Sequence, residues 1–106
     1  MMTNTATDRQ FVATDLTGIE RCLLRNNDGG GRTSFVRLKA GAQVPRHRHM
    51  GNEEVIVIAG VVEIDGVIMK EGDFLFTEAG EEHDLTALED AIIFVSSQKQ
   101  TQFVEA

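Results

Sequence analysis

Apolar residues in this chain come in short runs separated by turn residues. No segment holds the i, i+3, i+4, i+7 rhythm of an amphipathic helix over a dozen residues. Glycine-containing turns, such as residues 26–31 and 65–66, separate the runs. Many short strands at regular spacing are typical of an all-β barrel or sandwich. The candidate strands are residues 11–16, 19–24, 33–40, 55–59, 61–64, 67–69, 74–76, 83–88 and 91–97.

Length and charge narrow the possible partners. The 106 residues are enough for one domain with a single core. Residues 1–9 are polar and without periodicity, which predicts a flexible tail or an arm that orders against a partner, and residues 10–106 then form the barrel. The net charge is −7 and no cluster of Lys and Arg stands out. Nucleic acid and anionic membrane surfaces are therefore not expected partners.

The sequence also favours a cytoplasmic location. No apolar run approaches the roughly 20 residues needed to span a bilayer. Residues 1–10 have neither the basic nor the apolar region of a signal peptide. The one cysteine, Cys22, allows no internal disulfide, fits a reducing compartment, and is expected to be a small buried apolar residue.

Two runs, residues 55–58 and 91–95, are apolar at both strand parities. One face can line the barrel interior, and the other must then be covered as well. Either the N-terminal strands of the same chain or a second subunit can supply this cover. We expect a homodimer on this ground.

Two histidines one residue apart are the centre of the candidate site. Alternate side chains of a strand share a face, so His47 and His49 are expected to point the same way. Glu53 or Glu54 could return to them from a neighbouring strand, and His83 completes the set. Imidazole nitrogens and a carboxylate suit divalent transition metals. The plainer alternative is a pair of exposed strand histidines flanked by arginines.

The spacing of these residues resembles that of the cupins. The first cupin motif, G-x5-HxH-x3,4-E-x6-G, is filled at every position from Gly41 to Gly60. The second motif, G-x5-PxG-x2-H-x3-N, fits residues 72–87, except that Glu78 replaces the proline and Ala87 replaces the asparagine. The resemblance implies a double-stranded β-helix (an RmlC-like jelly roll), usually a homodimer. Carried over position by position, it makes the metal ligands His47, His49, Glu53 and His83.

Within the cupins, residues 34–95 most resemble the cupin domain of ChrR-type anti-sigma factors and small dioxygenase-like proteins. ChrR-type proteins also carry a separate zinc-binding helical domain that holds the sigma factor. These 106 residues have no room for that domain, so we do not expect the resemblance to transfer sigma binding.

Other residues near the motifs have open assignments. Glu81, Glu82 and Asp84 are expected to be solvated, with the alternative that one of them orients an imidazole. Phe74 and Phe76 share a strand face and either pack in the core or line the pocket. Phe103 is expected on the barrel exterior or against a partner.

Three functions compete. The first is a mononuclear-metal enzyme, an oxygenase or isomerase, that binds a small bidentate anionic substrate in the barrel through one Zn, Fe, Mn or Ni ion. The second is a non-catalytic metal-binding sensor or regulatory module like the ChrR cupin domain. The third, a metal-free jelly roll that binds a sugar or other small molecule, is disfavoured by the intact ligand set. Because neutral imidazoles bind metals, occupancy is expected to fall below about pH 6.

Overall fold

Short antiparallel strands account for most of the ordered structure. The computed structural model describes residues 1–105, and within that range the chain forms eleven strands and one short 3-10 helix. The elements are η1 Ala6–Asp8, β1 Val12–Ala13, β2 Ile19–Asn26, β3 Arg32–Leu38, β4 Gln43–Arg48, β5 Glu53–Ala59, β6 Val61–Ile64, β7 Val67–Lys70, β8 Phe74–Thr77, β9 Glu82–Ala87, β10 Ala91–Ser97 and β11 Gln102–Phe103.

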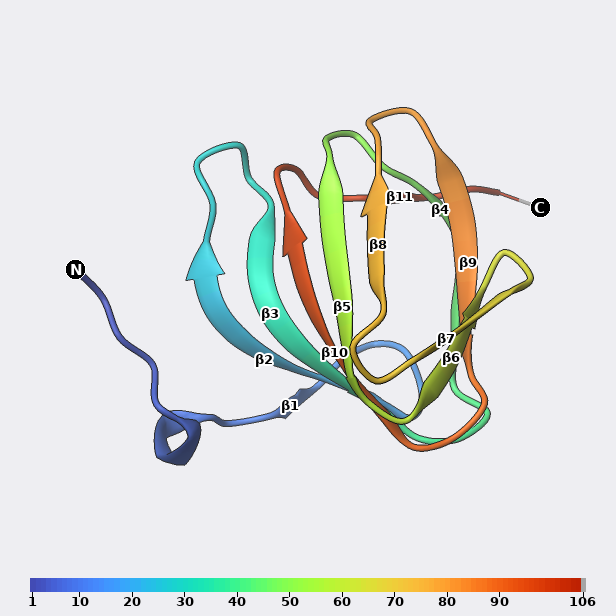
Figure 1. Cartoon of the computed structure of the whole chain (residues 1–106). Helices are drawn as coiled ribbons and strands as arrows, with labels where there is room; N and C mark the ends of the chain where they lie inside the picture. The colour runs from blue at the N-terminus through green and yellow to red at the C-terminus, as the bar shows by residue number, and fades with distance from the viewer. Residues whose placement is uncertain (106) are drawn as a thin grey trace.

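The strands make two antiparallel sheets that form a jelly roll (Figure 1). One sheet has the order β1-β2-β3-β10-β5-β8, and the other has the order β11-β4-β9-β6-β7. Strands that follow one another in the chain often belong to different sheets, as β4 and β5 do, so the chain crosses repeatedly between the layers. The predicted all-β double-stranded β-helix is confirmed. No helix within residues 1–105 has the length and apolar character needed to cross a membrane.

Alternation along the strands places one apolar core between the sheets. In β5, Val55 and Val57 are buried, whereas Ile56 and Ile58 are exposed on the outer face. The core draws on both sheets. Its buried members are Ile19, Val36, Leu38, Ala42, Val55, Val57, Val62, Ile64, Met69, Leu85, Ala87, Ala91 and Ile93.

The barrel interior changes from apolar to polar along its length. On β5, the inward position next to the core residue Val55 is Glu53, at the first residue of the strand. On β3 and β8 the buried polar residues are Ser34 and Thr77. Cross-strand pairing aligns Glu53 with Thr77, so the polar residues occupy one end of the barrel. One end of the interior is therefore a packed core, and the other is able to hold charged groups.

Gly60 has a structural role at the apolar end. Its φ is +79°, a conformation that L side chains rarely adopt. A Cβ atom at this position would overlap the carbonyl oxygen of Asp90. The turn between β5 and β6 passes so close to the start of β10 that only glycine fits.

Several sequence expectations were wrong in detail. Residues 11–16 give only the two-residue β1, because the Thr14 hydroxyl binds the carbonyl of Ile19 and the amide of Leu16 and so closes a turn. Phe74 and Phe76 lie neither in the core nor in the pocket. They are 55% and 46% exposed, and it is the intervening Leu75 that packs against the core.

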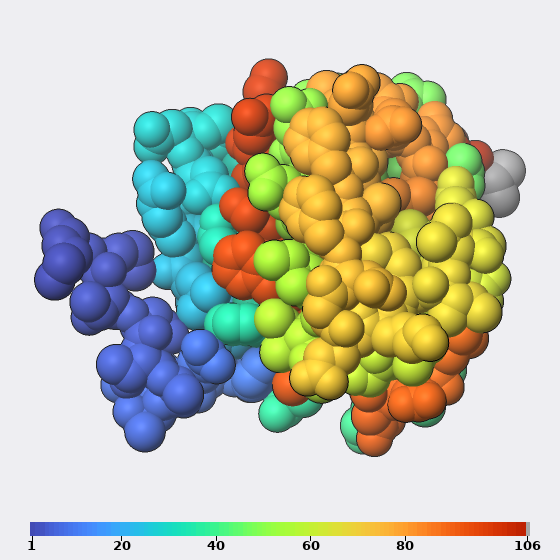
Figure 2. Space-filling model, in the orientation of Figure 1, coloured from blue at the N-terminus to red at the C-terminus, as the bar shows by residue number. Residues whose placement is uncertain are grey.

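The N-terminal segment is exposed. Residues 1–10 are all exposed, and in Figure 2 they project from the body of the molecule. Arg9 stacks on the Phe35 ring at 4.3 Å from its centroid, which anchors the segment near β3. The N-terminal strands lie beyond β3 at the edge of their sheet, so they do not cover the outer face of β5. The division into a tail of residues 1–9 and a barrel of residues 10–106 stays a prediction.

Candidate metal centre

Three histidines meet at the polar end of the barrel. His47 on β4 and His83 on β9 are direct cross-strand partners, so their side chains leave the sheet on the same face. His49 follows the last residue of β4. The ring centroids are 4.8 Å apart for His47 and His49, 4.7 Å for His47 and His83, and 4.3 Å for His49 and His83. All three side chains are buried, so the alternative of exposed strand histidines is wrong.

The spacing of the three imidazoles fits a shared cation. One nitrogen of each ring lies within 4.8 Å of the other two. Metal–nitrogen distances of about 2.0–2.1 Å place two nitrogens on one ion at most about 4.2 Å apart. Small side-chain movements are enough to close the difference. The residues present therefore fit a divalent metal, with borderline nitrogen donors of the kind that zinc, iron, manganese and nickel accept.

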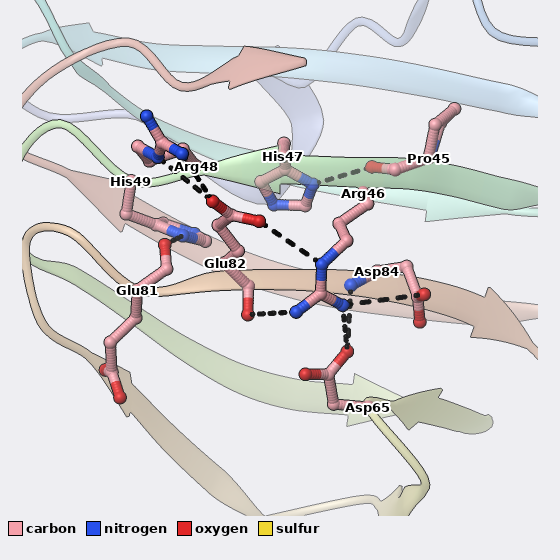
Figure 3. A network of polar contacts seen from close by, with 9 residues as sticks. All are labelled: Pro45, Arg46, His47, Arg48, His49, Asp65, Glu81, Glu82 and Asp84. Atoms are coloured by element: carbon pink, nitrogen blue, oxygen red, sulfur yellow. Dashed lines mark hydrogen bonds and ion pairs between the residues drawn. The ribbon is translucent and has the colours of Figure 1, made fainter. Parts of the chain in front are cut away.

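Main-chain carbonyls fix the orientation of two of the rings. His47 Nδ1 donates to the carbonyl of Pro45 at 2.9 Å, and His49 Nδ1 donates to the carbonyl of Glu81 at 3.1 Å (Figure 3). A carbonyl can only accept, so the proton of each neutral ring is on Nδ1. Each Nε2 then presents its lone pair to the centre of the cluster.

Glu53 reaches the cluster from the opposite sheet. Its Oε1 lies 3.0 Å from His49 Nε2, and its Oε2 accepts a hydrogen bond of 2.7 Å from the Ser97 hydroxyl. Glu54 points outward and is exposed, beside Phe76 on β8. The expectation that the carboxylate returns on the strand next to the histidines was wrong, because β5 belongs to the other sheet. That Glu53 is the fourth metal ligand stays a prediction.

The outer face of the same strands carries an ion-pair network (Figure 3). Glu82 accepts from Arg46 at 3.3 Å and from Arg48 at 2.7 Å, and Arg46 also contacts Asp65 at 3.1 Å. These side chains clamp β4 to β9 on the face opposite the histidines. The main-chain carbonyls of Pro45 and Glu81 orient two of the imidazoles, and the side chains of Glu81, Glu82 and Asp84 form no hydrogen bond to them.

Burial and neighbouring charges shift the pKa values of the three histidines in different directions. Desolvation, with the neighbouring charges of His49 and His47, lowers the pKa of His83 to about 4. Desolvation also lowers the pKa of His47. For His49, desolvation works against the charged ring, but hydrogen bonding and attraction to Glu53 outweigh it and raise the pKa. Burial works against the charged form of Glu53 too, yet His49 and Ser97 together lower its pKa. His49 and Glu53 therefore form an ion pair when a proton is between them.

A cavity opens from this cluster. It has a volume of about 270 Å³ and is lined by His47, His83 and Glu53 at the polar end and by apolar residues of both sheets, including Val36, Val44, Leu85 and Ile93.

Residues that sequence reasoning missed also line the cavity: Arg21, Arg32, Ser97 and Lys99. In the sequence, the signal for Arg21 was that it shares its strand parity with the apolar Ile19. In the structure it pairs with the buried Val36. Phe103, expected outside the barrel or at a partner, lies at the cavity wall beside β4.

Known proteins resemble this chain both in sequence and in fold. Residues 1–102 match the family model described as the ChrR Cupin-like domain. The chain belongs to the ChrR cupin-like family. A curated relative, the DNA damage-repair/toleration protein DRT102 of Arabidopsis thaliana, is 31% identical over 98 residues, covering 86% of this chain. This chain spans only 31% of that relative's length.

Solved structures share the cupin fold at low identity. An RmlC-like cupin from Ralstonia eutropha JMP134 has 17% identity and a TM-score of 0.85, covering 95% of this chain and 70% of that one. An acetylacetone dioxygenase from Acinetobacter johnsonii has 16% identity and a TM-score of 0.83, covering 99% and 77%. The complex of SigE with the anti-sigma ChrR from Rhodobacter sphaeroides has 21% identity and a TM-score of 0.76, covering 88% and 51%.

The lowered pKa of His83 predicts how the stability of the metal-free cupin depends on pH. Between pH 6.5 and about 4 the unfolded chain binds a proton at His83 that the folded chain does not. The free energy of unfolding should therefore fall as pH falls through this window. The part of the slope of unfolding free energy against pH that comes from His83 should approach the value for one proton bound on unfolding. Urea unfolding of chelator-treated protein from pH 7 to pH 4.5, followed by circular dichroism, measures the slope. His83→Gln should flatten it, and an unchanged slope in that variant would contradict the assignment.

Proposed function

We propose that this cupin is a small mononuclear-metal enzyme of dioxygenase-like type, acting on a small bidentate anionic substrate. His47, His49, Glu53 and His83 would hold one divalent transition metal (zinc, iron, manganese or nickel). The observation that carries the proposal is a cluster of three buried imidazoles, two of which, His47 and His83, line a cavity of about 270 Å³. A purely structural site is closed by protein ligands, whereas this cluster faces space that a small molecule can enter.

The residues around the cluster suit such chemistry. His47, His49, Glu53 and His83 would hold a divalent metal, which would supply Lewis-acid chemistry to a small bidentate molecule. Pro45 and Glu81 fix two imidazoles through their carbonyls, and Ser97 fixes the Glu53 carboxylate. Preorganised donors need no rearrangement when substrate arrives. The apolar residues of the cavity wall, such as Val36 and Leu85, would contact the apolar part of the substrate.

The alternative is a non-catalytic metal-binding sensor or regulatory module. Membership of the ChrR cupin-like family favours it, as does the fold shared with the SigE–ChrR complex. In that case the metal would be structural or oxidant-responsive, and the output would be a protein contact. The open cavity beside the histidines is what makes us prefer the enzyme.

We further propose that the outer face of β5 and β8 is covered by a second copy of the chain. Ile56, Ile58, Phe74 and Phe76 are 37–55% exposed and adjacent on this face. Contiguous exposed aromatic and branched side chains favour an interface over free surface.

We also propose a cytoplasmic location. Buried, unpaired Cys22 is compatible with the reducing conditions of that compartment.

The dimer proposal predicts twice the 11.7 kDa chain mass in light scattering at micromolar concentration. Phe76→Glu should give monomers, because it buries an unpaired charge in the interface. Val67→Glu, at a residue that is also exposed but lies on β7 in the other sheet, should remain dimeric. A monomeric wild-type protein would remove the proposal.

The ligand set predicts the order of metal affinities. His47→Ala, His49→Ala and His83→Ala should each lose most of the affinity, because each removes a nitrogen donor. Glu53→Gln should weaken binding by about tenfold or more, whereas the matched change Glu54→Gln, at an exposed outward residue, should have little effect. Competition with a chromophoric chelator measures each constant. An effect of Glu54→Gln equal to or larger than that of Glu53→Gln would show that the carboxylate is wrongly assigned.

The proposed activity predicts oxygen consumption by the Fe(II)-loaded protein with β-diketones or catechol-like compounds. Zinc-loaded protein should bind the same compounds without consuming oxygen, because zinc has no redox chemistry. Fe(II)-loaded His47→Ala should be inactive. An oxygen electrode follows the reaction. If the loaded wild-type protein retains iron and consumes no oxygen across the panel, the regulatory alternative is the better account.

A further inference from the structure

Three cationic side chains line the cavity that the histidines face. They are Arg21, Arg32 and Lys99. The chain carries a net charge of −7, so acidic partners are abundant. Even so, within residues 1–105 no carboxylate lies in ion-pair distance of any of the three. Arg37 pairs with Glu20, and Arg46 and Arg48 pair with Glu82. In the described residues the other cations without such a partner (Arg9, Arg25, Lys39 and Lys70) are exposed, whereas Arg21 and Arg32 are partly buried.

Arg21 points toward the barrel interior. It pairs across β2 and β3 with Val36, a core residue, so its side chain leaves the sheet toward the barrel interior. It is partly buried, and within residues 1–105 its side chain makes one hydrogen bond, from Nη1 to the Ser34 hydroxyl at 3.1 Å. A guanidinium has five N–H donors, so most of its hydrogen-bonding capacity remains for another partner.

Glu53 attracts Arg21 but is not within ion-pair distance of it. Its attraction raises the pKa of Arg21, but burial and the charge of Arg32 outweigh it and lower that pKa. The two carboxylate oxygens of Glu53 are engaged by His49 and Ser97. A metal at the histidines would add further positive charge. The cavity therefore has an excess of positive charge that its own residues do not neutralise, and a desolvated cation of this kind is costly unless a ligand pairs with it.

We propose that Arg21 binds a carboxylate of the substrate, while the chelating end of the same molecule reaches the histidine cluster. This rests on the proposed function and narrows its substrate class. The substrate is a small acid whose carboxylate is separate from a bidentate dicarbonyl end. The planar guanidinium suits a carboxylate because it can donate two parallel hydrogen bonds. Arg32 and exposed Lys99 lie at the same cavity and attract the anion toward it.

The test compares two diketones that differ only at one end. In 4,6-dioxoheptanoate a carboxylate replaces a terminal methyl group of heptane-2,4-dione. Isothermal titration of the zinc-loaded protein measures binding without turnover, and the zinc content is checked before and after. The acid should bind about ten- to a hundredfold more tightly than the neutral diketone, as expected for a charge-assisted bidentate contact.

Matched variants assign the preference to one residue. Arg21→Gln should abolish the preference for the acid while leaving the affinity for heptane-2,4-dione and for zinc unchanged. Arg25→Gln removes the same charge from an exposed position on the same strand, outside this cavity, and should keep the preference. Arg21→Lys, which retains the charge without the planar fork, should give an intermediate preference. It also serves as the second variant if Arg21→Gln does not fold.

The outcomes separate this proposal from the proposed function. Equal affinity of the wild-type protein for the two diketones, or equal losses in Arg21→Gln and Arg25→Gln, overturns the role of Arg21 and leaves the metal site standing. Failure to retain any of zinc, iron, manganese and nickel overturns the proposed function instead. The anion site is then read on the metal-free protein by NMR titration with butanoate and with butanamide. Shifts at the Ser34 amide with butanoate only, lost in Arg21→Gln, support the site, and their absence overturns it.

Discussion

The register between β4 and β9 is the constraint on which the candidate site depends. Pairing His47 directly with His83 brings together two imidazoles that are far apart in the chain and aims them into the same space. A slip of one residue would turn one of the two histidines to the outer face. On that outer face Glu82 bridges Arg46 and Arg48, so the same register that joins the histidines also joins an ion-pair network. Exposed ion pairs contribute little energy singly, but a network with one geometry disfavours the shifted pairing.

One end of the barrel is a packed apolar core, and the other end contains the buried polar groups. Val57, Val62 and Leu38 are fully or almost fully buried and form the packed end, where Gly60 lets the β5–β6 turn approach β10. The other end collects buried polar groups, and every buried side-chain nitrogen and oxygen in the described residues has a hydrogen-bond partner. Burying charge is costly, so concentrating it at one end leaves the apolar contacts of the other end to stabilise the fold. The site can thus change its protonation or ligands without disturbing the core.

Sequence reasoning predicted what depends on spacing along one strand or within one motif. The HxH pattern predicted that His47 and His49 share one side of a strand, and their ring centroids do lie 4.8 Å apart. Sequence reasoning failed where the answer depends on which strands are neighbours. Glu53 comes from the opposite sheet, and Phe74 and Phe76 face outward because Leu75 takes the inward position. Both parities of these runs are apolar, so no local pattern could decide the direction.

The cationic residues of the cavity also could not be identified from local sequence pattern. Arg21 is one of three charged residues in the partly buried strand β2, and no motif near it in the sequence marks it as functional. Its significance comes only from the groups around it: a buried Ser34 hydroxyl, a Glu53 carboxylate already engaged, and three imidazoles at the same polar end. His49 keeps an ion pair with Glu53 when a proton is between them, while the lowered pKa values of His47 and His83 keep those rings neutral. A cation that binds at the cluster therefore competes with the proton that His49 and Glu53 share.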